Sequence, residues 1–172
     1  GISSHLGLAY GSAPAGATIG VVDVPGHERF VRNMLAGVCG IDFVILVVAT
    51  DDGVMPQTIE HLHIVDLLSV RRGIAVITKT DRVVPERVDE VAGSVRALLS
   101  STGLADVDLL PDSASSGTGM EQLRASLDTA GATIGREGPQ GPQARLGVGR
   151  DIGVAGTAAV FTRAGYGGGG GR

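Results

Sequence analysis

The sequence predicts an α/β fold built on a largely parallel sheet. Short apolar runs alternate with segments of about ten to fifteen residues whose apolar positions recur at helical spacing, and this alternation is typical of βαβ units. The clearest run, from Phe43 to Ala49, is continuously apolar, as strands buried on both faces of a parallel sheet are. Right-handed crossovers between such strands place helices on both faces of the sheet.

The first half of the chain is expected to hold three strands and two helices. Residues 5–10 and 18–22 are strand-like and are joined by a turn rich in Gly, Ser, Ala and Pro. Residues 28–38 are predicted to be helical because their apolar positions recur at helical spacing. An Asp-Asp-Gly sequence ends the strand at 43–49, and residues 57–68 resume the helical period.

The second half repeats this alternation. Residues 73–78 are strand-like, and residues 85–99 are predicted to form a helix, since Pro85 suits a first turn. Residues 107–110 are expected to be a further short strand, and residues 119–127 the last helix.

The composition changes after this helix. Gly, Pro and Gln replace the periodic pattern over residues 131–144, which indicates a linker. Residues 145–150 and 158–162 are then expected to form a hairpin that opens a second, β-rich unit over residues 145–172, which ends in a glycine-rich tail. Residues 1–130 are accordingly predicted to form one α/β domain.

The composition also excludes several classes of protein. The 172 residues are 43% hydrophobic and 19% charged, so the chain lacks the low hydrophobicity of a disordered protein. A net charge of −4 gives no general attraction to nucleic acid or to an anionic membrane. The single cysteine, Cys39, excludes an internal disulfide and a cysteine-based zinc site. No apolar run approaches the ~20 residues of a membrane helix and no secretory signal is found, so a cytoplasmic location without membrane contact is expected.

The first segment that suggests chemistry is Asp23-Val24-Pro25-Gly26-His27, which follows a strand and precedes a predicted helix. Ligands of open α/β sheets lie beyond the carboxyl ends of the strands. An aspartate there holds a magnesium ion, the glycine lets backbone N–H groups approach a phosphate, and the helix N-terminus favours negative charge. His27 is placed to orient a water molecule for attack. Taken alone, the segment is also consistent with a Pro-Gly turn and an exposed histidine.

Two further segments follow later strands. Thr78-Lys79-Thr80-Asp81 contains the one lysine of the chain. An aspartate there accepts hydrogen bonds from N1 and N2 of guanine, which adenine cannot supply, while the lysine stem lies over the base and its ammonium braces a neighbouring loop. Ser113-Ala114-Ser115 follows the next strand, where backbone N–H groups are expected to contact the base oxygen. Each segment alone is also consistent with an ordinary turn.

Together, the three segments occur in the order and approximate spacing of a GTPase. The sequence resembles the translational GTPases, and most closely the bacterial selenocysteine-specific elongation factors. Thr78 stands where most GTPases have Asn, and this favours the selenocysteine branch over elongation factor Tu. The similarity is carried by Gly1-Ile2-Ser3, by Asp23-Val24-Pro25-Gly26-His27-Glu28-Arg29-Phe30, by Asn33-Met34-Leu35-Ala36-Gly37-Val38, and by Gly40-Ile41-Asp42 with Asp51-Asp52-Gly53-Val54-Met55.

This resemblance implies a P-loop-NTPase-like G domain that binds GTP or GDP with Mg²⁺. Asp23 would hold the magnesium shell, and Ser3 stands where the family has a switch I threonine that contacts the same ion. Gly26 would donate to the γ-phosphate, and His27 would place the hydrolytic water. On the base side, the guanine-reading residues would be Lys79 and Asp81, supported by Thr78, Ser113 and Ala114.

The chain also departs from the family. It has no G-x-x-x-x-G-K-[ST] segment, and its one lysine is Lys79, so the phosphate-binding loop with its strand and helix is expected to be missing. Residues 1–130 would then be a partial, N-terminally truncated GTP-binding domain, and residues 145–172 the start of a β-barrel domain. The missing strand is expected to leave an apolar sheet edge beside residues 18–22 or 43–49.

Three functional hypotheses follow. The first is a GTP-hydrolysing factor that delivers selenocysteyl-tRNA to the ribosome at UGA codons, with further domains contacting a selenoprotein mRNA hairpin. The second is another translational GTPase, of the elongation factor Tu or initiation factor 2 gamma type. The third is a non-catalytic piece with the GTPase fold and no useful nucleotide affinity.

Overall fold

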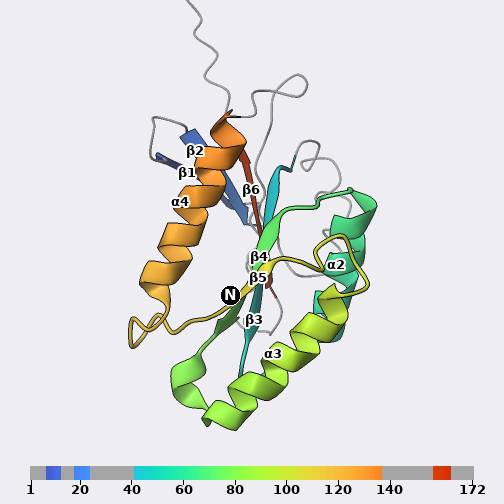
Figure 1. Ribbon diagram of the computed structural model, residues 1–172, viewed down its shortest axis with the longest axis vertical. Coiled ribbons are helices and arrows are strands. Elements are labelled where there is room, and N and C mark those ends of the chain that lie inside the picture. Colours follow the sequence, from blue (N-terminus) through green and yellow to red (C-terminus); the bar gives the residue numbers. More distant parts are fainter. Residues whose placement is uncertain (1–6, 13–17, 24–40, 137–156, 164–172) are drawn as a thin grey trace, which may run out of the picture.

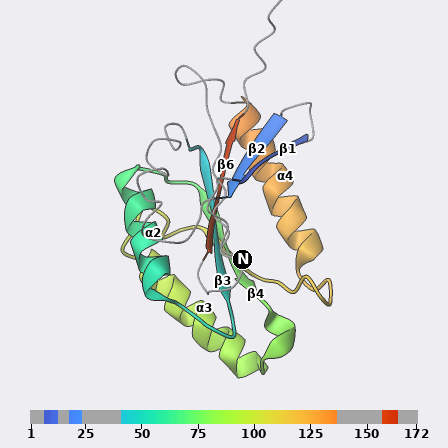
Figure 2. The same ribbon diagram turned by 180° about the vertical axis from the view of Figure 1, so that it is seen from behind.

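The structure, a computed structural model, describes residues 7–12, 18–23, 41–136 and 157–163. These residues form one six-stranded mixed sheet with helices on both faces (Figure 1 and Figure 2). The strand order is β1-β2-β6-β3-β4-β5. The strands are β1 (Gly7–Ser12), β2 (Thr18–Asp23), β3 (Phe43–Ala49), β4 (Gly73–Thr78), β5 (Asp108–Pro111) and β6 (Thr157–Arg163); the helices are α2 (Pro56–Leu67), the 3₁₀ turn η2 (Thr80–Arg82), α3 (Pro85–Leu99) and α4 (Met120–Arg136).

The apolar strand β3 separates two hydrophobic layers. Its alternate residues Val44, Leu46 and Val48 pack with the buried residues of α2 and α3, whereas Phe43 and Ile45 pack on the opposite face against α4. Successive side chains of a strand point to opposite faces of the sheet, so a continuously apolar strand serves both layers. The prediction of a sheet with helices on both faces is confirmed.

The carboxyl ends of the parallel strands β3, β4 and β5 lie side by side, along one edge of the sheet. Their register pairs Ala49 of β3 with Thr78 of β4, and Ile77 of β4 with Pro111 of β5. The loops that follow these strands therefore begin side by side, at the edge where open α/β sheets bind ligands.

The last helix is longer than the sequence indicated. It was expected to end at residue 127, but α4 continues to Arg136 and takes up the first part of the predicted 131–144 linker. Leu123, Leu127, Ala130 and Ile134 follow one another at helical spacing and pack against the α4 side of the sheet. This burial keeps the Gly- and Thr-containing end of the segment helical.

The C-terminal strand is also placed differently from the prediction. Residues 158–162 were expected to belong to a separate β-rich unit, but β6 lies in the main sheet, antiparallel to both β2 and β3. It thereby pairs with the two strands beside which an open edge was expected. The unpaired N–H and C=O groups of such edges favour pairing with any available strand, and β6 supplies one.

Some predicted elements lie outside the described residues, namely the helix at 28–38 and the strand at 145–150. Among the helices that are described, none has the length and apolar character needed to cross a membrane.

Candidate functional site

The loop after β4 is fixed by a buried threonine. Thr50, which directly follows β3 and is fully buried, donates its hydroxyl to the carbonyl oxygens of Thr78 at 3.1 Å and Lys79 at 2.9 Å. Lys79 adopts a left-handed backbone conformation with φ of 60°. This conformation is uncommon for a residue with a side chain, and such residues concentrate at functional sites.

The Lys79 side chain reaches back over the loop after β3. Its Nζ atom lies 2.9 Å from Oδ1 and 2.7 Å from Oδ2 of Asp51, and 3.9 Å from Oδ2 of Asp52. The hydrogen bond and charge of Lys79 lower the pKa of Asp51 below its usual value. The sequence-based expectation that the lysine ammonium braces a neighbouring loop therefore agrees with the geometry.

Asp81 is held by the loop after β5. Ser113 Oγ donates to Asp81 Oδ1 at 2.6 Å, and Ser115 Oγ donates to Oδ2 at 3.0 Å. These two hydrogen bonds, with that from Ser113 the larger cause, lower the pKa of Asp81. The exposed carboxylate thus stays ionised and faces solvent as a pair of acceptor oxygens.

Asp112, which precedes the loop of residues 113–119, ties this loop to β4 and to the turn after it. Its backbone N–H donates to Ile77 of β4 at 2.8 Å, and its carbonyl oxygen accepts the Thr80 hydroxyl at 3.0 Å. The Asp112 side chain is buried and its Oδ2 atom has no hydrogen-bond partner among the described residues. Desolvation by this burial raises the pKa of Asp112.

The structure brings together the predicted base-reading residues. Thr78 ends β4, Lys79 and Asp81 follow it, and Ser113 and Ala114 lie on the loop after β5, with Asp81 hydrogen-bonded directly to Ser113. The side chains of Lys79 and Asp81 are accessible at this edge, and Ala114 is exposed beside them.

Of the residues predicted to bind phosphate and magnesium, the structure describes only Asp23. Asp23 is the last residue of β2, and its backbone pairs with Ala159 of β6, which in turn pairs with Ile45 of β3. Asp23 and Ile45 are therefore two strand positions apart, roughly 10 Å. Both β2 and β3 are antiparallel to β6, so β2 runs in the same direction as β3, toward the side of the sheet where the loops after β4 and β5 lie. Ser3, Gly26 and His27 lie outside the described residues.

Sequence reasoning missed the roles of three side chains at this edge. Asp51 was read as a loop residue, Thr50 was assigned no role, and Ser115 was included with Ser113 and Ala114 as a backbone donor while its side chain was assigned no role. A polar residue directly after an apolar strand, as at Thr50, is the signal that could have marked the first two. The Ser115 contact had no such signal, because it depends on how the loop folds back over Asp81.

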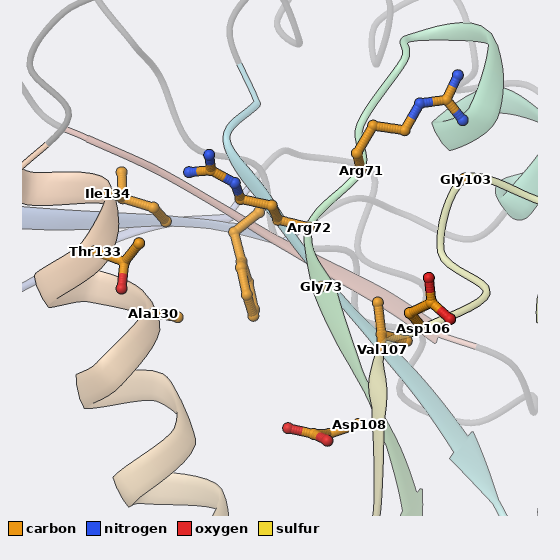
Figure 3. Close-up of a pocket in the computed structure, with 11 residues that line it drawn as sticks. Arg71, Arg72, Gly73, Gly103, Asp106, Val107, Asp108, Ala130, Thr133 and Ile134 are labelled. Atoms are coloured by element: carbon orange, nitrogen blue, oxygen red, sulfur yellow. The ribbon is translucent and has the colours of Figure 1, made fainter.

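A separate hollow lies at the opposite edge of the sheet (Figure 3). It has a volume of about 340 Å³ and is bounded by the amino ends of the parallel strands and the last turns of α4. Arg71, Arg72, Asp106 and Asp108 contribute to its lining. It includes none of the residues predicted to bind nucleotide.

The family model for the elongation factor Tu GTP binding domain matches residues 2–132. The chain belongs to this family. Two curated relatives of this GTP-binding domain are selenocysteine-specific elongation factors. That of Escherichia coli (strain K12) is 49% identical over 127 residues, covering 74% of this chain and 21% of the relative. That of Desulfomicrobium baculatum is 43% identical over 134 residues, covering 78% and 21%. The chain therefore spans about a fifth of the length of these relatives.

Solved structures agree with this assignment of the GTP-binding domain. A bacterial selenocysteine-specific elongation factor EF-Sec matches with a TM-score of 0.69 and 36% identity, over 77% of this chain and 23% of that one. Elongation factor SelB from Methanococcus maripaludis, in complex with the GTP analogue GPPNHP, matches with a TM-score of 0.68 and 29% identity, over 75% and 28%. The resemblance to selenocysteine-specific elongation factors inferred from the sequence is confirmed.

Proposed function

We propose that this chain is the guanine-nucleotide-binding part of a GTP-hydrolysing, selenocysteine-specific translation elongation factor. The observation that carries the proposal is the exposed Asp81 carboxylate, fixed by Ser113 beside the braced Lys79 at the ligand-binding edge of the sheet. The names of the relatives at 43% and 49% identity support the selenocysteine branch over elongation factor Tu and initiation factor 2 gamma.

The base is recognised by matching donors to acceptors. Guanine presents N1–H and an exocyclic amino group side by side, and an ionised carboxylate accepts from both. Such charge-assisted bidentate bonds are about twice as strong as neutral ones. Adenine lacks this pair of donors, so Asp81 discriminates against it. Thr78 and Ala114 shape the two loops, and the Lys79 stem lies along the base.

On the phosphate side, Gly26 donates to the γ-phosphate and His27 places the attacking water. Asp23 and Ser3 supply hard oxygen ligands of the kind that Mg²⁺ prefers, and Asp23 ends a strand that points toward the correct edge. Magnesium is usually held by one or two carboxylates together with substrate phosphates, which is the set of ligands proposed here. When bound, Mg²⁺ neutralises charge on the phosphates.

The relatives' names support a role in translation. We propose that the factor acts with selenocysteyl-tRNA and the ribosome in the cytoplasm. Recognition of a selenoprotein mRNA hairpin would fall to parts of the factor outside this chain. The 172 residues themselves have no phosphate-cradling G-x-x-x-x-G-K-[ST] loop, so we expect their own affinity for GTP or GDP to be in the high micromolar range or weaker.

The decisive experiment is an NMR titration of the chain with GDP and with ADP, because NMR detects weak binding. We expect GDP to shift the amide signals of residues 79–81 and 113–115 and ADP to leave them unchanged. Asp81→Asn should abolish the GDP response, since an acceptor oxygen becomes a donor facing other donors. Equal responses to GDP and ADP, or an Asp81→Asn variant that still responds to GDP, would refute base recognition at this edge.

A further inference from the structure

The two serines that hold Asp81 differ in their surroundings. Ser113 is fully buried, and its Oγ atom also accepts a hydrogen bond from the backbone N–H of Ser116 at 3.2 Å. It therefore supports the carboxylate from the interior of the protein. Ser115 is exposed and donates to the other oxygen, Oδ2, from the solvent side.

This arrangement matters because a bound guanine needs both oxygens of Asp81. The carboxylate is exposed, so a base approaches it from solvent, the same side as Ser115. Each hydroxyl donates one hydrogen, and Ser115 directs its hydrogen to Oδ2. A base donor that approaches Oδ2 would have to share this oxygen with the Ser115 hydroxyl or displace it.

The loop that carries Ser115 is short and built on unusual backbone geometry. Gly117 and Gly119 have φ of +80° and +79°, and Gly117 N–H donates to the carbonyl oxygen of Ser113 at 2.8 Å. Next to Ser115, the Ser116 hydroxyl bonds to that of Thr118 at 2.8 Å and not to Asp81. The loop thus fixes Ser113 and Ser116 through several bonds, while the Ser115 hydroxyl is directed to Asp81.

We propose that the Ser115 hydroxyl is a self-ligand of Asp81: it competes with guanine for Oδ2, and a bound base displaces it. The proposal rests on the function assigned above to Asp81. Ser113 acts in the opposite sense, because it orients the carboxylate from the interior whether or not a base is bound. Ser115 therefore lowers the affinity for guanine.

Ser115→Ala tests this idea, with Ser116→Ala as the matched control in the same loop. Removing a competing hydrogen bond should raise the affinity of the chain for GDP by roughly 2- to 10-fold, the factor that one net hydrogen bond represents. Binding of ADP should not change. Ser116→Ala removes hydrogen bonds within the loop but none to Asp81, so it should not raise GDP affinity, and Ser113→Ala should lower it. An unchanged or weaker GDP affinity in Ser115→Ala would overturn the proposal.

A second readout does not depend on nucleotide. In the free chain, Ser115→Ala should raise the pKa of Asp81, measured from its carboxyl ¹³C shift, because a donor to the ionised form is lost. An unchanged Asp81 pKa would show that the contact is not made in solution and would also overturn the proposal. If Asp81→Asn retains GDP binding, the assignment of the base site itself is wrong. If Asp81→Asn loses binding while Ser115→Ala gains none, only the self-ligand role fails.

Discussion

Asp51 and Lys79, 28 positions apart in the chain, form a bidentate ion pair, with the Lys79 ammonium 2.7 and 2.9 Å from the two Asp51 carboxylate oxygens. The pair ties the loop after β3 to the loop after β4. It therefore holds the Lys79 side chain against the loop after β3.

We expect Asp51→Asn to lower the free energy of unfolding by at most about 1 kcal/mol, because both partners are more than one-third exposed and solvent screens the pair. The lowered pKa of Asp51 means that this stability is present above the usual pKa and is lost as the pH falls through the lower, folded-state value. Urea denaturation at low and high salt measures the effect, which should shrink in high salt. Asp52→Asn, whose carboxylate lies 3.9 Å from Lys79, is the control and should change less.

Thr50→Val should destabilise the loop that carries Lys79. The valine keeps the shape of the side chain but removes the hydroxyl that donates to the Thr78 and Lys79 carbonyls. Each carbonyl retains a backbone donor, so the expected loss is about 1–2 kcal/mol of unfolding free energy. Amide hydrogen exchange at Lys79 should become faster. Thr50→Ser retains the hydroxyl and should lose much less; equal losses in the two variants would assign the effect to packing.

The layers of this fold were predictable because they rest on local periodicity. Phe43–Ala49, Gly73–Thr78 and Pro85–Leu99 have the expected bounds, since an unbroken apolar run or a proline at a helix start is a local signal. The end of α4 was not predictable in this way. Its last turns are helical because Ile134 finds a partner layer in the sheet, and that depends on tertiary packing.

The position of β6 shows a second limit of sequence reasoning. The pattern of residues 158–162 indicates a strand but carries no information about its neighbours. Pairing with β2 and β3 is decided by which edges are available in the folded sheet. The residues predicted to read the base could be proposed from the sequence because their types and order at strand ends reflect a chemistry, whereas the role of the Ser115 side chain is visible only in its contact with Asp81.

Asp112→Asn is expected to stabilise the protein at neutral pH. The pKa of Asp112 is raised above its usual 3.8 by burial, so the fold favours the protonated carboxyl. The stability that this group contributes is complete below the usual pKa and is lost as the pH rises through the raised value. Urea denaturation between about pH 4 and pH 8 should show the advantage of Asn shrinking as the pH falls. Asp108→Asn at an exposed position of β5 is the control, and a stability gain that is independent of pH would contradict this explanation.

Val160→Pro should separate the two parts of the sheet. Val160 pairs with Val22 of β2 and Val44 of β3, and among the described elements β6 is the strand that joins the β1–β2 pair to β3, β4 and β5. Proline removes a backbone N–H from a central strand and leaves an acceptor unsatisfied, at a cost of about 1–3 kcal/mol. Val160→Thr keeps both the N–H and the β-branch, and should therefore cost less stability than Val160→Pro. Hydrogen exchange of β2 amides checks the result: protection that survives Val160→Pro would show that β6 is not the link.

The last prediction separates the roles of His27 and Asp81 in a hybrid factor, in which residues 1–130 of this chain replace the corresponding segment of the Escherichia coli relative. His27→Ala should leave GTP affinity within a few-fold, because the role proposed for the imidazole is to place the attacking water and not to bind the ground-state nucleotide. Ribosome-stimulated hydrolysis should fall by ~10²-fold or more, as is common when a positioning group is lost.

Asp81→Asn in the same hybrid should do the reverse. Guanine binding should weaken by a factor of ~10 or more, since donors are left facing donors, while hydrolysis by the bound fraction survives. Nucleotide affinity and single-turnover hydrolysis, measured for both variants, distinguish the two effects, and the unsubstituted hybrid is the reference. A His27→Ala variant that loses GTP binding, together with an Asp81→Asn variant that keeps it, would show that the two loops have been assigned the wrong way round.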